Sequence, residues 1–266
     1  MFTAAIWEPA WTTVRARGIG DHILAWVYSV GFPFRISGPP AISITGLTFL
    51  RNRLPDDEEV RAAKFVSPLY AGMAGPGMRS RPESASATRS QTLDVYAGWL
   101  GDAMPLPAMM LGHAGKRGNT PDAIRRYLQR GCEADGTFPT GTVFFVVSED
   151  VRSKCREWQY QPALVQLRGL GVHAVITNRM PGGKAGVIGL MSGAAAVTPP
   201  ADVTYLPGCM AEHLTSEAAM FESDRQVTLA AWLDAGATAS AGTVSEPFAN
   251  WNKFPTAFFF CHYAAG

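Results

Sequence analysis

Short apolar runs alternate with helical stretches over most of this chain, and no other sequence feature constrains the fold as strongly. The runs of strand length are Ile23–Tyr28, Pro107–Leu111, Thr142–Val147, Val172–Ile176 and Val187–Met191. Helical stretches of about ten residues separate the later runs, as in proteins that alternate strands with helices. The sequence therefore predicts one α/β domain over residues 1–266, with a mostly parallel sheet and helices on both faces.

Three helices have local start or stop signals. Pro9 marks the start of the first, because proline is tolerated in the first helical turn, and Gly18 suits its end. Thr120 is a capping residue for a second helix, which we expect to run to about Arg130. A third is expected over Val227–Ala235, which a glycine follows.

Residues 38–92 show neither the helical nor the strand pattern of apolar residues. Its part from Gly72 to Arg89 is rich in Gly, Pro, Ser and Arg, which is typical of surface loops and disordered segments. We therefore expect an irregular or disordered insert at about residues 38–92 within the single domain.

Composition excludes several classes of function. The chain has 266 residues, 47% hydrophobic and 17% charged, with a formal net charge of +1. A chain so near neutrality has no general attraction for nucleic acid or for an anionic membrane surface, so we expect no nucleic-acid partner. The longest apolar stretch is broken by Gly31 and Pro33 and falls short of the ~20 residues that a membrane helix needs. No membrane span is predicted.

The two ends of the chain carry different signals. The first residues lack the basic and apolar regions of a signal peptide, so no targeting segment is predicted there and the localisation stays open. The last residues, from Phe258 to Gly266, stop within an apolar segment, whereas domains usually end in polar, frayed sequence. We therefore expect the chain to be truncated and the apolar side chains of Thr256–Tyr263 to lack a cover.

No metal or cofactor motif is found in the sequence. The four cysteines form no C-x-x-C pair, and the five histidines show no zinc-ligand spacing. A P-loop, a G-x-S-x-G elbow and an H-E-x-x-H helix are absent as well. We therefore predict neither a metal nor a cofactor, and buried thiols are the simplest interpretation of the cysteines.

Reactive residue types are densest between Cys209 and Ser216, where a thiol, a carboxylate, an imidazole and two hydroxyls occur within eight residues. In a helix, Cys209, Glu212, His213 and Ser216 would share one face. A helix start after Gly208 would also lower the pKa of the thiol. The alternative is a polar helix face with Cys209 turned inward.

A second candidate segment follows shortly afterwards. Ala237–Val244 is rich in small residues and is expected to form a strand that carries Glu246 to its carboxyl end, where ligands of parallel sheets bind. Pro247 favours an extended backbone at Glu246. We expect the Glu246 carboxylate to face the same cleft as His213 and Ser216; a solvated surface carboxylate is the alternative.

These two segments also carry a family resemblance. Pro207–Ser216 reads Pro-Gly-Cys-Met-Ala-Glu-His-Leu-Thr-Ser, and Gly242–Pro247 reads Gly-Thr-Val-Ser-Glu-Pro. With Ala134–Pro139, Gly189–Gly193 and Lys253–Pro255, they resemble an uncharacterised bacterial family whose members are mostly predicted to be exported. The likeness spans about residues 20–266. It implies export and a chain that continues further, and it supplies no activity.

Two departures from the family pattern affect the candidate site. The family's Asp-His is Glu212-His213 here. Its Ser-Phe-Gly-Gly is Ser216-Glu-Ala-Ala219 here, which removes two glycines from any tight backbone site.

A more distant likeness is to caspase-like and gingipain-like cysteine peptidases. In these, one strand ends in His-Gly and the next ends in the nucleophilic cysteine. The corresponding strands here would be Val187–Gly193 and Val203–Cys209. The likeness implies a caspase-like three-layer sandwich. Ser192-Gly193 stands where His-Gly would be needed, so another residue would have to supply the imidazole.

Two function hypotheses follow. The first is a peptidase-like cysteine hydrolase with Cys209 as nucleophile, His213 as base, and Glu246 or Glu212 orienting the imidazole. The residues that would bind its substrate are Glu212, Thr215, Ser216 and Lys253. The second is a non-catalytic α/β binding module, a degenerate relative of such peptidases, which the missing His-Gly favours. A small molecule or a peptide is the expected ligand, and no feature indicates an oligomeric state.

Overall fold

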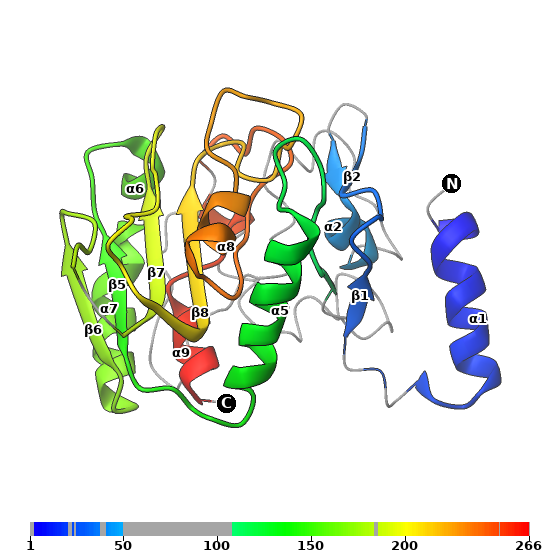
Figure 1. The fold of residues 1–266 in the computed structure, drawn as a ribbon, viewed down its shortest axis with the longest axis horizontal. Helices are drawn as coiled ribbons and strands as arrows, with labels where there is room; N and C mark the ends of the chain where they lie inside the picture. The colour runs from blue at the N-terminus through cyan, green and yellow to red at the C-terminus, as the bar shows by residue number, and fades with distance from the viewer. Residues whose placement is uncertain are drawn as a thin grey trace.

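A four-stranded parallel sheet forms the centre of the protein (Figure 1). The computed structural model describes residues 3–20, 23, 25–37, 41–49, 108–183, 186–249 and 251–265. The strands lie in the order β6-β5-β7-β8. Their bounds are Thr142–Val146 for β5, His173–Thr177 for β6, Val187–Gly193 for β7 and Tyr205–Leu214 for β8. The predicted α/β fold with a parallel sheet is confirmed.

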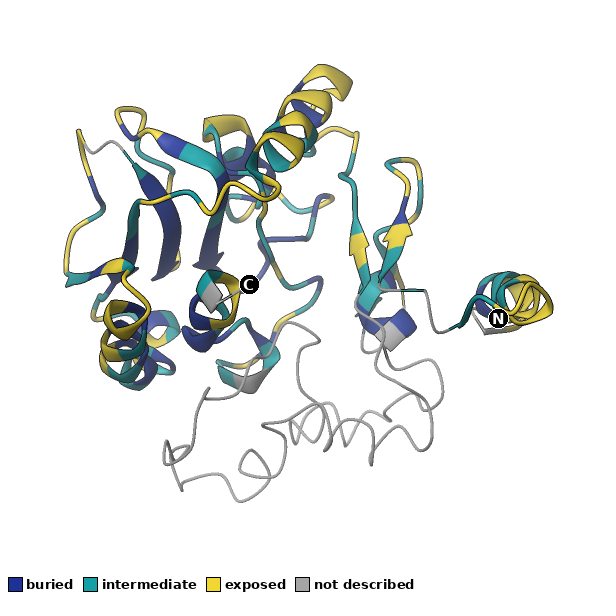
Figure 2. Cartoon of the chain, turned by 90° about the horizontal axis from the view of Figure 1, so that it is seen from below, coloured by how far each residue is buried: buried dark blue, intermediate teal, exposed yellow. Residues whose placement is uncertain are grey.

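Helices cover both faces of this sheet. One face packs against α7 (Tyr160–Gly169) and α9 (Phe258–Ala265). The opposite face packs against α8 (Ala230–Ala235) through Trp232, which is fully buried. Almost every residue of β5 and β7 is buried, and Figure 2 shows buried strand segments in dark blue within the sheet.

The sequence of β5 explains why it lies at the centre. Its side chains are β-branched or aromatic, and they alternate between the two faces of the sheet. Phe145 stacks on Tyr160 of α7, with 5.0 Å between the ring centroids. Phe144 points the other way, into the cluster around Trp232. A strand buried on both faces needs such a continuous apolar run.

The helix α5 (Pro121–Ala134) lies beside β8 and α8. It begins as expected, because the Thr120 hydroxyl accepts a hydrogen bond from the Ala123 N–H at 3.2 Å. It extends four residues beyond the predicted end at Arg130. Two short elements, α6 (Val151–Lys154) and the 3₁₀ turn η3 (Glu157–Gln159), connect β5 to α7.

The N-terminal part forms two smaller sheets on the far side of α5 (Figure 1). The π-helical turn η1 (Thr3–Trp7) leads into α1 (Glu8–Ala16). The strand β1 (Trp26–Tyr28) pairs in parallel with β4 (Ala108–Met110). The strand β2 (Arg35–Ile36) pairs antiparallel with β3 (Ile42–Ser43), which α2 (Ile44–Phe49) follows.

The expected irregular insert is only partly visible. Residues 42–49 belong to β3 and α2, so the prediction of irregular structure is wrong there. Ile44 and Leu47 pack with Trp7 and Tyr28, and this packing overrides the weak local pattern. The remainder of the predicted insert, residues 38–40 and 50–92, lies outside the described residues.

Two expectations around Cys209 are wrong. The segment from Cys209 onward continues β8 to Leu214 instead of forming a helix, because it pairs with β7 along its length. Ala237–Val244 forms no strand; its one ladder contact is an isolated bridge between Ala239 and Met210. The Ala239 N–H bonds to the Cys209 carbonyl oxygen and the Ala211 N–H bonds to the Ala239 carbonyl oxygen, so the chain runs parallel beside β8 for one bridge without forming a strand.

The last apolar segment is well packed, contrary to the expectation of uncovered side chains. Phe258, Phe260 and Cys261 are almost fully buried against the face that α7 also covers. The reason is that the segment forms α9 and the 3₁₀ turn η4 (Trp251–Lys253) precedes it. Across the described parts of the chain, no helix combines the length and the apolarity that crossing a membrane requires.

Two glycine substitutions should change stability in opposite directions. An added Cβ at Gly189 of β7 would lie 2.6 Å from the Phe260 ring, so Gly189→Ala should destabilise the fold by about 1–3 kcal/mol through overpacking. Gly131 of α5 has room for a Cβ, so Gly131→Ala should stabilise it by about 0.5–1 kcal/mol. Urea unfolding measures both. Equal stability of Gly189→Ala and the unchanged chain would contradict this packing of α9.

Candidate functional site

The carboxyl ends of β5, β7 and β8 are tied together by one pair of side chains. The Asp150 carboxylate accepts hydrogen bonds from the N–H groups of Arg152 and Ala195, each at 2.9 Å. The Arg152 guanidinium donates to Ser216 Oγ at 2.9 Å. Gly193 permits this contact, because a Cβ there would lie 2.5 Å from the Arg152 carbonyl oxygen. In open parallel sheets, this edge is where ligands bind.

A buried ion pair lies just behind this edge. Arg156 Nη2 and Glu212 Oε2 are 2.5 Å apart, and both side chains are buried. Arg156 also donates to the Ser192 carbonyl oxygen. Burial raises the pKa of the Glu212 carboxyl, while the Arg156 guanidinium acts in the opposite direction. The pair therefore fixes a carboxylate at the end of β8.

Several buried polar atoms have no hydrogen-bond partner within the described residues, and two of them, Nε and Nη1, belong to Arg156 itself. The hydroxyl oxygens of Ser192 and Thr215 are two others. Leaving such groups unsatisfied costs about 1–3 kcal/mol each. Buried polar groups of folded proteins are normally satisfied, by ordered water where protein atoms do not serve.

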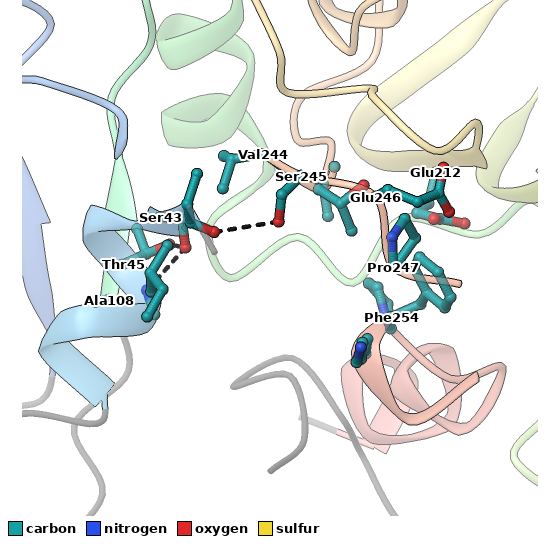
Figure 3. Close-up of a pocket in the computed structure, with 17 residues that line it drawn as sticks. Ser43, Thr45, Ala108, Glu212, Val244, Ser245, Glu246, Pro247 and Phe254 are labelled. Carbon is teal, nitrogen blue, oxygen red and sulfur yellow. Dashed lines mark hydrogen bonds between the residues drawn. The ribbon is translucent and has the colours of Figure 1, made fainter. Parts of the chain in front are cut away.

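Glu212 also lines a cavity of about 180 Å³ (Figure 3). Residues 41–46 form one wall, and residues 241–247 and 253–255 form the others. Figure 3 shows Ser43 and Thr45 on one side, Glu212 and Phe254 on the other, and Ser245 between them. Segments that are far apart in the sequence thus enclose one pocket.

The pocket walls are held together by hydrogen bonds. The Ser245 hydroxyl donates to the Ala41 carbonyl oxygen at 3.1 Å, and Arg35 Nη1 donates to the Val244 carbonyl oxygen at 3.2 Å. The Ser43 hydroxyl accepts from the Gly46 N–H at 3.0 Å. These bonds hold the N-terminal segment against the residues that follow α8.

Glu246 and Lys253 provide the other two charged groups of the pocket. Glu246 Oε1 accepts a hydrogen bond from the Phe248 N–H at 2.9 Å. Lys253 Nζ lies 5.8 Å from the centroid of the Phe248 ring. Burial lowers the pKa of the Lys253 amine, and the Glu246 carboxylate opposes this effect.

The backbone next to Glu246 is strained. Phe248 and Ala249 have φ values of 59° and 54°, in the left-handed region that residues with a Cβ rarely adopt. Such outliers persist only where the surrounding structure holds them, and they cluster at binding and catalytic sites. The strain therefore adds to the evidence for this pocket.

Cys209 lies away from the pocket, in the middle of β8. Its side chain is 0% exposed and packs in the cluster around Trp232. Burial raises the pKa of the thiol above its usual range. A nucleophilic cysteine needs an accessible thiol and a lowered pKa, so this environment gives the thiol neither property.

His213 is buried on the same face of β8 as Cys209. Its Nε2 bonds to the Val227 carbonyl oxygen at 3.1 Å, and burial lowers its pKa to about 4. Four residues along a strand span about 13 Å between Cα atoms. The expectation that Cys209, Glu212 and His213 share one face is therefore wrong, because successive residues of a strand alternate in direction.

The expectation that Glu246 faces the same cleft as His213 and Ser216 is also wrong. Glu246 lines one pocket with Glu212, whereas His213 points to the opposite face of β8 and does not line it. The Ser216 hydroxyl is held by Arg152, and the Ser216 carbonyl oxygen accepts from the Thr243 hydroxyl at 2.9 Å. Of the predicted site residues, only Glu212, Glu246 and Lys253 line the pocket; Cys209, His213, Thr215 and Ser216 do not.

Sequence reasoning missed two parts of the site. Arg156 lies in the turn between α6 and η3, where an arginine is normally a surface residue, and nothing local marks it as the partner of Glu212. Ser43 and Thr45 fall in the segment predicted to be irregular. Recognising the short strand Ile42–Ser43 in the sequence could have identified Ser43 and Thr45. Within the described ranges, no three His, Cys, Asp or Glu side chains are grouped to hold a metal ion.

Thiol labelling should separate the cysteines by exposure. Cys132 is exposed, whereas Cys209 and Cys261 are buried. In the folded protein, iodoacetamide should alkylate Cys132 within minutes to hours and Cys209 only after unfolding in urea. Peptide mass spectrometry identifies the modified residue. Native alkylation of Cys209 as fast as that of Cys132 would contradict its burial.

Stability should fall in acid because of His213. Its pKa is about 4 in the folded protein against 6.5 for an unperturbed histidine. The unfolded chain therefore binds the extra proton between these values, and about 3 kcal/mol of stability is lost as the pH falls from 6.5 to 4. The free energy of unfolding, measured in urea at a series of pH values across this range, should fall less steeply with decreasing pH for His213→Gln than for the exposed control His173→Gln. Equal slopes would contradict the assignment.

Comparison with protein-family models, curated proteins and solved structures finds no match for this chain. The resemblance to the mostly exported bacterial family, and the distant likeness to caspase-like peptidases, therefore stay predictions. Function has to be argued from the geometry of the site.

Proposed function

We propose that this chain is a non-catalytic α/β binding module for a small zwitterionic ligand, such as an amino acid or the end of a peptide. The observation that carries the proposal is the convergence of Glu212, Glu246 and Lys253 on one pocket at the carboxyl edge of the sheet. This edge is the usual ligand position in parallel sheets.

The charges of the pocket suit a molecule with both signs. Lys253 offers an ammonium group to a ligand carboxylate, and Glu246 offers a carboxylate to a ligand ammonium group. Glu212 is already neutralised by Arg156. Hydrogen bonds between charged partners are stronger than those between neutral groups, so they favour a zwitterion over an uncharged molecule.

The size of the pocket favours a small ligand. Its volume of about 180 Å³ is below the roughly 300–1,000 Å³ typical of sites for drug-sized molecules. Val244 and Phe254 supply apolar surface between the charged groups. The hydrogen bonds of Ser245 and Arg35 pre-form the walls, and preorganisation reduces the entropy lost on binding.

The buried thiol favours binding over hydrolysis. Cys209 is inaccessible, and its separation from His213 along β8 exceeds the reach of a hydrogen bond. Neither residue lines the pocket. We therefore do not propose the cysteine-hydrolase mechanism for this site.

Calorimetric titration of the full chain with free amino acids and dipeptides tests the proposal. Binding should weaken at least about tenfold, or about 1.4 kcal/mol, in Glu246→Gln and in Lys253→Met. N-acetylated and amidated forms of the same ligands should bind more weakly, because each lacks one charge. Glu133→Gln and Lys116→Met are matched controls on exposed residues outside the pocket and should bind normally.

Two results would overturn the proposal. One is the absence of binding for every zwitterion of the panel by a chain that circular dichroism and thermal unfolding show to be folded. The other is turnover of a peptide or ester library that is lost in Cys209→Ala, which would establish a cysteine hydrolase instead.

A further inference from the structure

A second and larger cavity lies at the opposite edge of the central sheet, at the amino ends of the strands. Its volume is about 1,080 Å³. The carboxyl-terminal half of α5, residues 135–141 and α9 form its walls. Val143, Ile188 and Met210 of three adjacent strands form its floor. None of its residues lines the pocket around Glu246.

Exposed apolar side chains gather around this cavity. Phe138 is 77% exposed, Leu170 44% and Tyr263 40%, and all three line it. They come from three separate segments of the chain. Soluble proteins rarely expose apolar groups together unless a ligand or partner covers them.

Phe138 has a second unusual property. Its φ of 48° places it in the left-handed region, which is a marked outlier for a bulky residue. Pro139 follows it directly and restricts its backbone further. A strained backbone that holds an aromatic ring out in solvent is typical of a binding position.

Tyr263 is fixed in the cavity wall by a close contact. Its hydroxyl donates to the Gly208 carbonyl oxygen at 2.8 Å. Gly208 has φ of 83°, and a Cβ there would lie 2.6 Å from that hydroxyl. Glycine at this position of β8 therefore lets the Tyr263 hydroxyl approach the backbone closely, and the ring lines the cavity with its polar group already satisfied.

The charges around the cavity determine what it accepts. Among the described residues that line it, no lysine or arginine occurs, and Asp135 is the one carboxylate. His173 Nδ1 is bonded to the Thr142 hydroxyl at 3.1 Å. The lining therefore has no lysine or arginine to pair with an anionic ligand. Its apolar floor offers no hydrogen bonds, so burying a strongly polar ligand against it would be unfavourable.

We propose that this cavity is a binding site for an uncharged, largely apolar small molecule, which Phe138 and Tyr263 cover at the mouth. The volume of about 1,080 Å³ is just above the roughly 300–1,000 Å³ that is typical of small-molecule sites. The site is independent of the zwitterion pocket, because the two are lined by different residues at opposite ends of the strands.

Nile red, an uncharged apolar dye, is the probe for this site. Its fluorescence should rise saturably with the full chain, and Phe138→Ala should weaken binding at least fivefold. Gly131→Phe should weaken it more strongly, because Gly131 lines the cavity and an added Cβ there meets no atom closer than Thr238 Cγ2 at 3.5 Å, so a larger side chain would occupy space in the cavity. Val165→Ala is the control: it removes another exposed apolar side chain, on α7 outside both pockets, and should bind normally.

Cys132 gives a readout of where the dye sits. It is exposed and lines the cavity, so bound Nile red should slow its alkylation by N-ethylmaleimide, while Cys155 should react at an unchanged rate. This measurement decides the question even if Gly131→Phe fails to fold. Tighter binding of an anionic naphthalenesulfonate dye, or saturable Nile red binding without protection of Cys132, would overturn the proposal. Neither result bears on zwitterion binding at Glu246.

Discussion

The buried pair of Arg156 and Glu212 is the interaction on which the carboxyl edge of the sheet depends. The arginine precedes α7, the glutamate belongs to β8, and the arginine also binds the Ser192 carbonyl oxygen of β7. Removing one partner from such a pair leaves an unpaired buried charge, at a cost of about 3–5 kcal/mol. The pair therefore couples the position of the pocket carboxylate to the packing of three elements, and a pocket built this way has little freedom to rearrange.

The strands of the central sheet were predictable because their evidence is local. The apolar, β-branched run of β5 and the capped start of α5 each lie within a few residues of the chain. The segment after Cys209 was not predictable in the same way. Its residue types suit one helical face as well as a strand, and the choice is made by pairing with β7, which is a tertiary contact.

The candidate site was predictable in part for a related reason. Glu212, Glu246 and Lys253 were identified from their chemistry and their position near expected strand ends, and they do line one pocket. Whether His213 lies with these residues was not predictable, because it depends on the face of β8 to which each side chain points. Arg156 could not be found at all, since burial of a charged side chain is a property of the surrounding fold.

The alternation along β8 has a consequence for how this chain tolerates change. Glu212 faces the pocket around Glu246 and His213 faces Trp232, with one peptide bond between them. Inserting or deleting a single residue earlier in β8, with the pairing to β7 kept, would exchange the two directions. An imidazole would then face Arg156, and a carboxylate would enter an apolar cluster without a counter-ion. Substitutions in β8 should therefore be tolerated better than insertions or deletions, because the length of the strand determines the face to which each side chain points.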